Sequence, residues 1–287
     1  MNGHKKFLAL SHVVLIIITI LAVLPFYLLV LASFTEEKVA VSSGYSLVPN
    51  HLTLAAYQYL MTKAALFGRG YLITIIVTVV GVFVCILITL MFSYMLSRPN
   101  LPFRRILNFY VIFTMLFNGG LVSTYILYTQ TFHIKDTLWA LIIPNLLTNA
   151  FFIIMVRNYF ASNIPEELIE AARIDGCSET GIFFRVAFPL SKPIIATVGL
   201  MVGVSYWNDW QNGLYYLDDQ TLYGIQNILN AINANAKYLM SGANAASMPA
   251  ETARMAAAVI GIIPILIIYP FFQSYFVKGI TMGAVKG

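Results

Sequence analysis

The chain has 287 residues, of which 59% are hydrophobic and only 10% are charged. A mean hydropathy of +0.79 is typical of a chain that lies in lipid, and it excludes an ordinary water-soluble domain. The formal net charge of +5 does not indicate nucleic-acid binding, because the 17 Lys and Arg residues are scattered singly or in pairs and form no basic stripe.

Apolar runs long enough to cross a bilayer, which takes about 20 helical residues, recur along the chain. The first run is about twice as long as the apolar core of a signal peptide, so we expect a retained helix. The six expected spans are Phe7–Ser33, Tyr71–Leu96, Ile106–Thr129, Leu138–Phe160, Val186–Trp207 and Met255–Val277. The sequence therefore predicts an all-α, polytopic membrane protein, a single transmembrane domain over residues 1–287 with core spans at about 71–277.

Basic residues in the connections between spans predict the orientation of the chain. With a cytoplasmic N-terminus, eleven of the 17 Lys and Arg residues fall on the cytoplasmic side and six fall outside. We therefore expect both termini in the cytoplasm. The same orientation predicts a cytoplasmic segment at 162–189, an extracellular loop at 208–254 and a cytoplasmic tail at 278–287.

The expected spans hold no Asp, Glu, Lys or Arg near their middle. Such residues usually mark a proton relay or a coupling-ion site, so the chain offers no evident way to use an ion gradient. The chain also lacks the phosphate-binding pattern G-x-x-x-x-G-K-S/T. If it transports a solute, a partner chain is expected to bind and hydrolyse ATP. The dispersed histidines predict no metal site.

Polar residues within the spans, or at the outer end of the fifth span, are candidates for lining a polar path through the membrane. They are Asn118, Asn145, Asn149, Trp207, Asn208 and Asp209. Asparagines in a span also hold neighbouring helices together by hydrogen bonds, so both interpretations stay open.

One short segment gathers acidic residues in this otherwise apolar chain. Its members, five of the 12 acidic residues, are Glu166, Glu167, Glu170, Asp175 and Glu179. Ser162 or Asn163 is expected to cap a helix there, and Gly176 is expected to end it. Ser178 is expected to cap a second short helix. The sequence therefore predicts a helix–Gly–helix hairpin that is too short to be stable alone.

The first helix of this hairpin is expected to present a partly apolar face, made of Leu168, Ala171, Ala172 and Asp175. The small alanines let a foreign groove approach the backbone, and Glu170 is placed to pair with a basic residue. A helix lying on the inner leaflet is the alternative, but such helices carry Lys and Arg rather than Glu. We therefore expect a docking helix for a partner chain.

The hairpin resembles the EAA signature of ABC importer permeases, EAA-x3-G-x9-I-x-L-P. The matching residues are Glu170, Ala171, Ala172, Gly176 and Pro189, with Val186 and Phe188 in place of the usual Ile and Leu. The C-terminal QSYFVKGITMGAVKG (273–287) and WNDW (207–210) resemble carbohydrate permeases similar to the second membrane subunit of the maltose importer. The resemblance covers essentially the whole chain.

This resemblance implies the type I ABC importer transmembrane fold and a non-catalytic, multi-pass permease subunit of the bacterial inner membrane. It implies no cofactor on this chain, with ATP and Mg bound by partner subunits. The implied partners are a homologous second permease, two ATP-binding subunits, an extracellular or periplasmic solute-binding protein and membrane lipid. The implied substrate is a carbohydrate, expected to be an oligosaccharide or polysaccharide fragment as in alginate-type systems. A permease for another solute class and a self-sufficient secondary carrier are the alternatives.

The resemblance also implies residue roles. It places the coupling contacts with an ATP-binding subunit at Glu167, Glu170, Ala171, Ala172, Asp175, Gly176 and Pro189. It places a tail contact between the ATP-binding subunits at Lys278, Gly279, Gly283 and Lys286. The 208–254 segment corresponds to a loop that contacts the solute-binding protein.

Overall fold

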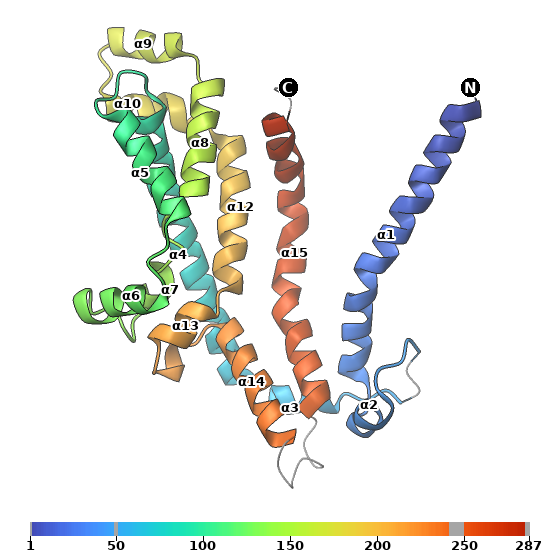
Figure 1. Cartoon of the computed structure of the whole chain (residues 1–287). Coiled ribbons are helices and arrows are strands. Elements are labelled where there is room, and N and C mark those ends of the chain that lie inside the picture. Colours follow the sequence, from blue (N-terminus) through green and yellow to red (C-terminus); the bar gives the residue numbers. More distant parts are fainter. Residues whose placement is uncertain (1, 49–50, 241–249, 285–287) are drawn as a thin grey trace. The chain divides into compact units, whose positions relative to one another are not determined.

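The computed structural model describes residues 2–48, 51–240 and 250–284 (Figure 1). These residues are mostly helical, and the β-type pairing found among them is an isolated bridge between Thr35 and Leu52. The chain divides into two compact units, which are described separately. The first holds Met1–Gly68 and Ile228–Pro264, and the second holds Arg69–Asn227 and Ile265–Gly287.

The first unit contains α1 (Asn2–Phe34), whose apolar stretch is long enough to cross a membrane and is not buried within the chain. The end of α1 packs against α3 (Ala55–Met61), where the Phe34 and Tyr57 rings lie 4.9 Å apart. After α1 comes the short helix α2 (Glu37–Ser43).

The carboxylate of Glu37 joins α2 to the start of α15 (Ala250–Ala284) in the first unit. It accepts hydrogen bonds from the backbone N–H groups of Glu251 and Thr252, each at 2.9 Å. The first N–H groups of a helix have no partner within it, and a negative charge is favourable there. Glu37 therefore caps α15 from a position more than 200 residues away in sequence.

The second unit is built on α4 (Ala64–Ser97), α5 (Arg104–Leu116), α8 (Ala150–Asn163) and α12 (Lys192–Asn208). Helices α4 and α12 approach closely because glycines face side chains across the contact. The Tyr206 ring lies directly over Gly81, and its hydroxyl donates a 2.8 Å hydrogen bond to the carbonyl of Ile142. Buried apolar side chains from α4, α8 and α12 form the core of this unit.

The expected third span, Ile106–Thr129, is not a continuous helix. Helix α5 ends at Leu116, and the chain resumes in α6 (Leu121–Ile126) and a π-helical turn (Leu127–Thr131) bent by 111° from α5. The break contains Asn118, whose side chain accepts from the Gly120 N–H at 2.8 Å, and Gly120 has φ +84°. Phe117, which follows the last residue of α5, has an extended backbone, and Gly120 is the residue just before α6, where glycine adopts a positive φ without strain.

The expected fourth span, Leu138–Phe160, is also interrupted. It consists of the single turn α7 (Trp139–Ile142), an irregular stretch, and α8, which starts only at Ala150. Pro144 has no N–H to donate, and Asn145 has φ +62°. Asn149 then caps α8, because its side chain accepts from the Phe151 N–H at 2.9 Å.

The fifth span was predicted to begin at Val186, which is earlier than the helix begins in the structure. Helix α12 starts at Lys192, and the residues before it belong to a segment bent by 80° that includes α11 (Phe188–Leu190). The expected sixth span lies within α15, which continues to Ala284. Of the residues that the structure describes, α1 and α4 are each long and apolar enough to cross a membrane, and the two bent pairs are further candidates.

Short helices lie at both ends of the second unit (Figure 1). One end carries α9 (Glu166–Ile174), α10 (Glu179–Ile182) and the π-helical turn Phe183–Ala187. The other end carries α13 (Gln211–Tyr216), the 3-10 turn Gln220–Leu222 and the start of α14 (Ile225–Met240). Much of the expected 208–254 loop is therefore helical.

Candidate functional site

The predicted hairpin is present as α9 and α10, joined at Gly176, which has φ +80°. Ser178 caps α10 as expected, because its hydroxyl accepts from the Gly181 N–H at 3.2 Å. The expected cap of the first helix is wrong. Ser162 and Asn163 are the last residues of α8, and α9 follows Pro165 without a side-chain cap.

One side of α9 faces the body of the unit and the other faces outward. Ile169 is fully buried and Ala172 packs against the core, so Ala172 does not lie on the outward face as predicted. The exposed residues of α9 and its end are Glu167, Leu168, Glu170, Ala171, Arg173, Ile174, Asp175 and Gly176. Ile174 is 86% exposed and was not predicted as part of this face. The outward face is therefore acidic with an apolar strip.

Two ion pairs hold the hairpin in shape. Arg173 donates to Glu179 at 2.7 Å across the Gly176 turn, and this hydrogen bond raises the pKa of the Arg173 guanidinium. Arg98, at the end of α4, donates to Glu166 at 3.0 Å and lies 4.7 Å from the ring centroid of Tyr94. Arg98 is almost fully buried, so this pair fastens the first turn of α9 to α4.

Tyr94 extends the attachment to the second arm of the hairpin. Its ring packs edge-on against Phe160 of α8, with ring centroids 5.8 Å apart, and at a tilt against Phe183, which follows α10, with centroids 5.4 Å apart. Pro189 lies beyond that arm in α11 and is exposed. The hairpin thus has a preformed shape and is attached to α4 and α8. Neither Arg98 nor Tyr94 was singled out in the sequence, because their partners are more than 60 residues away.

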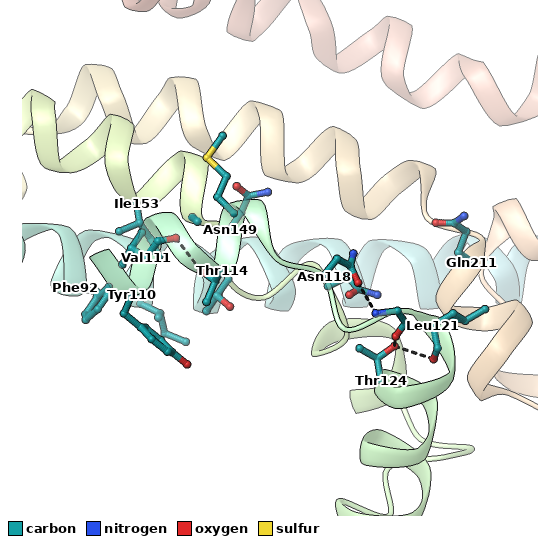
Figure 2. A pocket seen from close by; sticks show the side chains of 16 residues that line it. Phe92, Tyr110, Val111, Thr114, Asn118, Leu121, Thr124, Asn149, Ile153 and Gln211 are labelled. Atoms are coloured by element: carbon teal, nitrogen blue, oxygen red, sulfur yellow. Dashed lines mark hydrogen bonds between the residues drawn. The ribbon is translucent and has the colours of Figure 1, made fainter. Parts of the chain in front are cut away.

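Polar residues line a cavity of about 790 Å³ in the second unit. Figure 2 shows side chains from α4, α5, α6 and α8 around it, with Gln211 of α13. The three predicted asparagines of the spans all line this cavity. Its polar lining side chains are Tyr110, Thr114, Asn118, Thr124, Asn145, Thr148, Asn149 and Gln211.

Two of the helix breaks of the second unit lie at this cavity. Asn118 and Gly120 lie in the break after α5, and Asn145 and Asn149 lie in the break before α8. Irregular backbone is tolerated at membrane depth where it is buried in protein or lines a water-filled cavity. Such breaks at polar sites are common in transport proteins. The arrangement therefore fits a path for a polar solute.

The other predicted path residues lie outside the cavity. Trp207 is buried beside Tyr71, with ring centroids 6.3 Å apart. Asn208 accepts from Gln226 at 3.3 Å. Asp209 accepts from the N–H groups of Gln211 and Asn212 and so holds the start of α13, while burial raises the pKa of its carboxyl to about 6.

The predicted tail residues fall partly outside the described part of the chain. Lys278, Gly279 and Gly283 lie in the last turns of α15, which continues as a helix where a tail was expected. Lys286 lies outside the described residues.

The interrupted apolar helices, the polar cavity and the attached hairpin fit a permease that crosses a membrane. Residues 86–282 match the family model described as binding-protein-dependent transport system inner membrane component. A crystal structure of a bacterial ABC transporter involved in the import of the acidic polysaccharide alginate is similar, with a TM-score of 0.82 and 30% identity. The match covers 96% of this chain and 98% of that chain. The chain belongs to the family of binding-protein-dependent transport system inner membrane components.

Individual relatives have similar lengths. The polygalacturonan/rhamnogalacturonan transport system permease protein YtcP of Bacillus subtilis (strain 168) is 38% identical over 288 residues, covering 99% of each chain. Protein LplC of the same organism is 37% identical, covering 93% of this chain and 90% of LplC. The arabinooligosaccharides transport system permease protein AraQ of Halalkalibacterium halodurans is 29% identical, covering 94% of this chain and 93% of AraQ.

Proposed function

We propose that this chain is the permease subunit of an ATP-driven importer and moves an oligosaccharide through the membrane. The hairpin of α9 and α10 carries the proposal, because it is a preformed, attached element that presents Glu167, Glu170, Ala171 and Ile174 away from the core of its unit. Relatives named as permeases for polygalacturonan, rhamnogalacturonan and arabinooligosaccharides support a carbohydrate as the solute. The polar cavity at Asn118, Asn145 and Asn149 offers hydrogen-bonding groups suited to sugar hydroxyls.

In the proposed complex the chain crosses the membrane six times, with both termini in the cytoplasm. The spans would be α1, α4, the bent pair of α5 and α6, the interrupted α7 and α8, α12, and α15. A second permease would complete the path, and a solute-binding protein would deliver the sugar to the side of α13. Two ATP-binding subunits would hold ATP and Mg and receive the hairpin through Glu167, Glu170, Ala171, Ile174 and Asp175.

A self-sufficient secondary carrier is the competing function. Among the described residues, the polar side chains that line the cavity are amides and hydroxyls, and no acidic or basic side chain lines it. ATPase measurements on the purified native complex, with the solute-binding protein and a panel of oligosaccharides, distinguish the two. The proposal predicts ATP hydrolysis that a particular oligosaccharide stimulates. Uptake into vesicles by this chain alone, driven by an ion gradient, would favour the carrier.

Replacing Glu170 with Lys is expected to weaken capture of the ATP-binding subunits while the chain still inserts. Glu170 is exposed on the outward face of α9, so the change puts a repulsive charge against a basic partner residue without disturbing the fold. Co-purification of the ATP-binding subunits with the tagged chain measures the effect, and we expect a loss of about tenfold or more. Glu36→Lys makes the same charge change at an exposed residue of the first unit and serves as the control. Equal recovery with both variants would contradict the docking role of Glu170.

A further inference from the structure

A second pocket, of about 490 Å³, lies between α5 and α8 in the second unit. Its lining residues are Arg104, Arg105, Asn108, Phe109, Ile112, Ile154 and Arg157. Guanidinium groups thus come together at the start of α5, and apolar side chains continue from them along the helix. None of these residues lines the polar cavity.

The arginines of this pocket have no counter-charge within the described part of the chain. No acidic residue lines the pocket, and the ion pairs of the described residues involve other arginines and lysines. Arg104 donates to the carbonyl of Leu96 at 3.1 Å, and Arg157 donates to Asn158 at 3.2 Å. The Nε of Arg157 is buried without a hydrogen-bond partner. These contacts position the guanidinium groups but do not neutralise them.

The start of α5 adds to the positive potential of the pocket. Arg104 and Arg105 are its first two residues, its first turn contains no acidic residue, and no side chain caps it. The N-terminus of a helix favours anions, so basic residues there are opposite to the usual preference. An anion bound between Arg105 and Arg157 would relieve both the repulsion among the arginines and the unfavourable helix end.

The surroundings of the pocket indicate where that anion comes from. Phe103, Ile106, Phe109 and Ile112 are all exposed, with Phe103 at 75% and Phe109 at 68%. Amide and hydroxyl side chains that would suit a sugar gather instead at the polar cavity. Basic pockets between membrane helices, placed near the end of a span, are typical binding sites for anionic lipid headgroups.

We propose that this pocket binds the phosphate of an anionic phospholipid, with Arg105 and Arg157 as its principal ligands. The guanidinium groups donate hydrogen bonds to the phosphate oxygens, a geometry that suits arginine. The acyl chains lie along Phe109 and Ile112. The proposal rests on membership of a membrane family and on this geometry, and it does not depend on which solute the permease moves.

Native mass spectrometry of the full chain, purified in neutral detergent with its associated subunits, tests the proposal. The probes are phosphatidylglycerol and phosphatidylcholine with the same acyl chains. We expect one retained phosphatidylglycerol and no matching retention of phosphatidylcholine. The double variant Arg105→Gln/Arg157→Gln should bind phosphatidylglycerol about 25-fold more weakly, because each lost arginine weakens binding about fivefold.

Arg185→Gln, which removes one exposed arginine outside the pocket, should retain the lipid like the parent chain. The single variant Arg105→Gln, at an exposed position, replaces the double variant if the latter fails to fold, and it should show the fivefold loss. Equal retention of both lipids, or unchanged phosphatidylglycerol binding in these variants, would overturn the proposal. Arginine-dependent retention of a trigalacturonate or of inorganic phosphate, without phosphatidylglycerol, would also overturn it and place a soluble anion in the pocket.

Discussion

The Arg98→Met variant is expected to exchange the backbone amides of the docking hairpin about 30-fold faster than the parent chain. The change leaves Glu166 without its ion-pair partner and removes the cation from the face of the Tyr94 ring. The Arg98 side chain is only 9% exposed, so its half of the ion pair is buried. Breaking a fully buried ion pair costs about 3–5 kcal/mol. Glu166 is 38% exposed, so solvent screening reduces the cost of breaking this pair to about 2 kcal/mol. That free energy corresponds to an increase of about 30-fold in the equilibrium constant for local opening of the hairpin.

Hydrogen–deuterium exchange of residues 166–182 in the purified full chain measures this opening directly. Arg69→Met is the matched control, because Arg69 is an exposed arginine on the same helix, α4, and lies outside the ion pairs of the described chain. The charge-swapped chain, Arg98→Glu with Glu166→Arg, should recover part of the protection. Exchange that is accelerated in the Arg69 variant, or that is not accelerated in the Arg98 variant, would show that the Arg98–Glu166 pair does not fasten the hairpin to α4.

The second large effect is expected at Gly81, where a single methyl group should lower the unfolding midpoint by about 5 °C. A Cβ at Gly81 would lie 2.5 Å from the Tyr206 ring, a separation that packed side chains do not adopt. Relief requires α4 and α12 to separate or the ring to turn, and turning it breaks the 2.8 Å hydrogen bond to Ile142. Overpacking of this kind costs about 1–3 kcal/mol, to which loss of a buried hydrogen bond adds about 1 kcal/mol.

Gly68→Ala provides the control for this prediction on the same helix. Gly68 has open space around the position of a Cβ, so alanine there should leave stability unchanged or raise it through better helix propensity. Intrinsic fluorescence during heating of both variants in detergent gives the comparison. A Gly81→Ala chain that melts with the parent would mean that α4 and α12 are not packed through the Tyr206 contact.

The docking hairpin could be predicted from the sequence because its signals are local. Gly176, Ser178 and the acidic residues at the start of α9 lie within a few positions of one another, and each acts on the backbone beside it. The direction of Ala172 and the exposure of Ile174 could not be predicted, because they depend on which side of α9 meets the core. Amphipathic periodicity gives two faces but does not identify the buried one when both contain apolar residues.

The break between α5 and α6 was missed for a different reason. Apolar residues flank Asn118, so a window long enough to find a membrane span averages over the break. The three asparagines were predicted as candidates for lining a polar path within the spans or for holding helices together, and they lie at helix ends around one cavity. Their convergence depends on contacts between distant segments. The same is true of Glu37 at α15, which no local pattern indicates.

The most direct test of the central claim, that the hairpin couples this permease to an ATP-binding subunit, is site-specific photo-crosslinking in cells. A photoreactive residue at Ala171 lies on the outward face of α9, and one at Gln130 lies at an exposed position outside the hairpin. We expect a crosslink to an ATP-binding subunit from Ala171 and none from Gln130. A crosslink from Ala171 to lipid or to the solute-binding protein alone, or an ATP-binding subunit captured from Gln130, would contradict it.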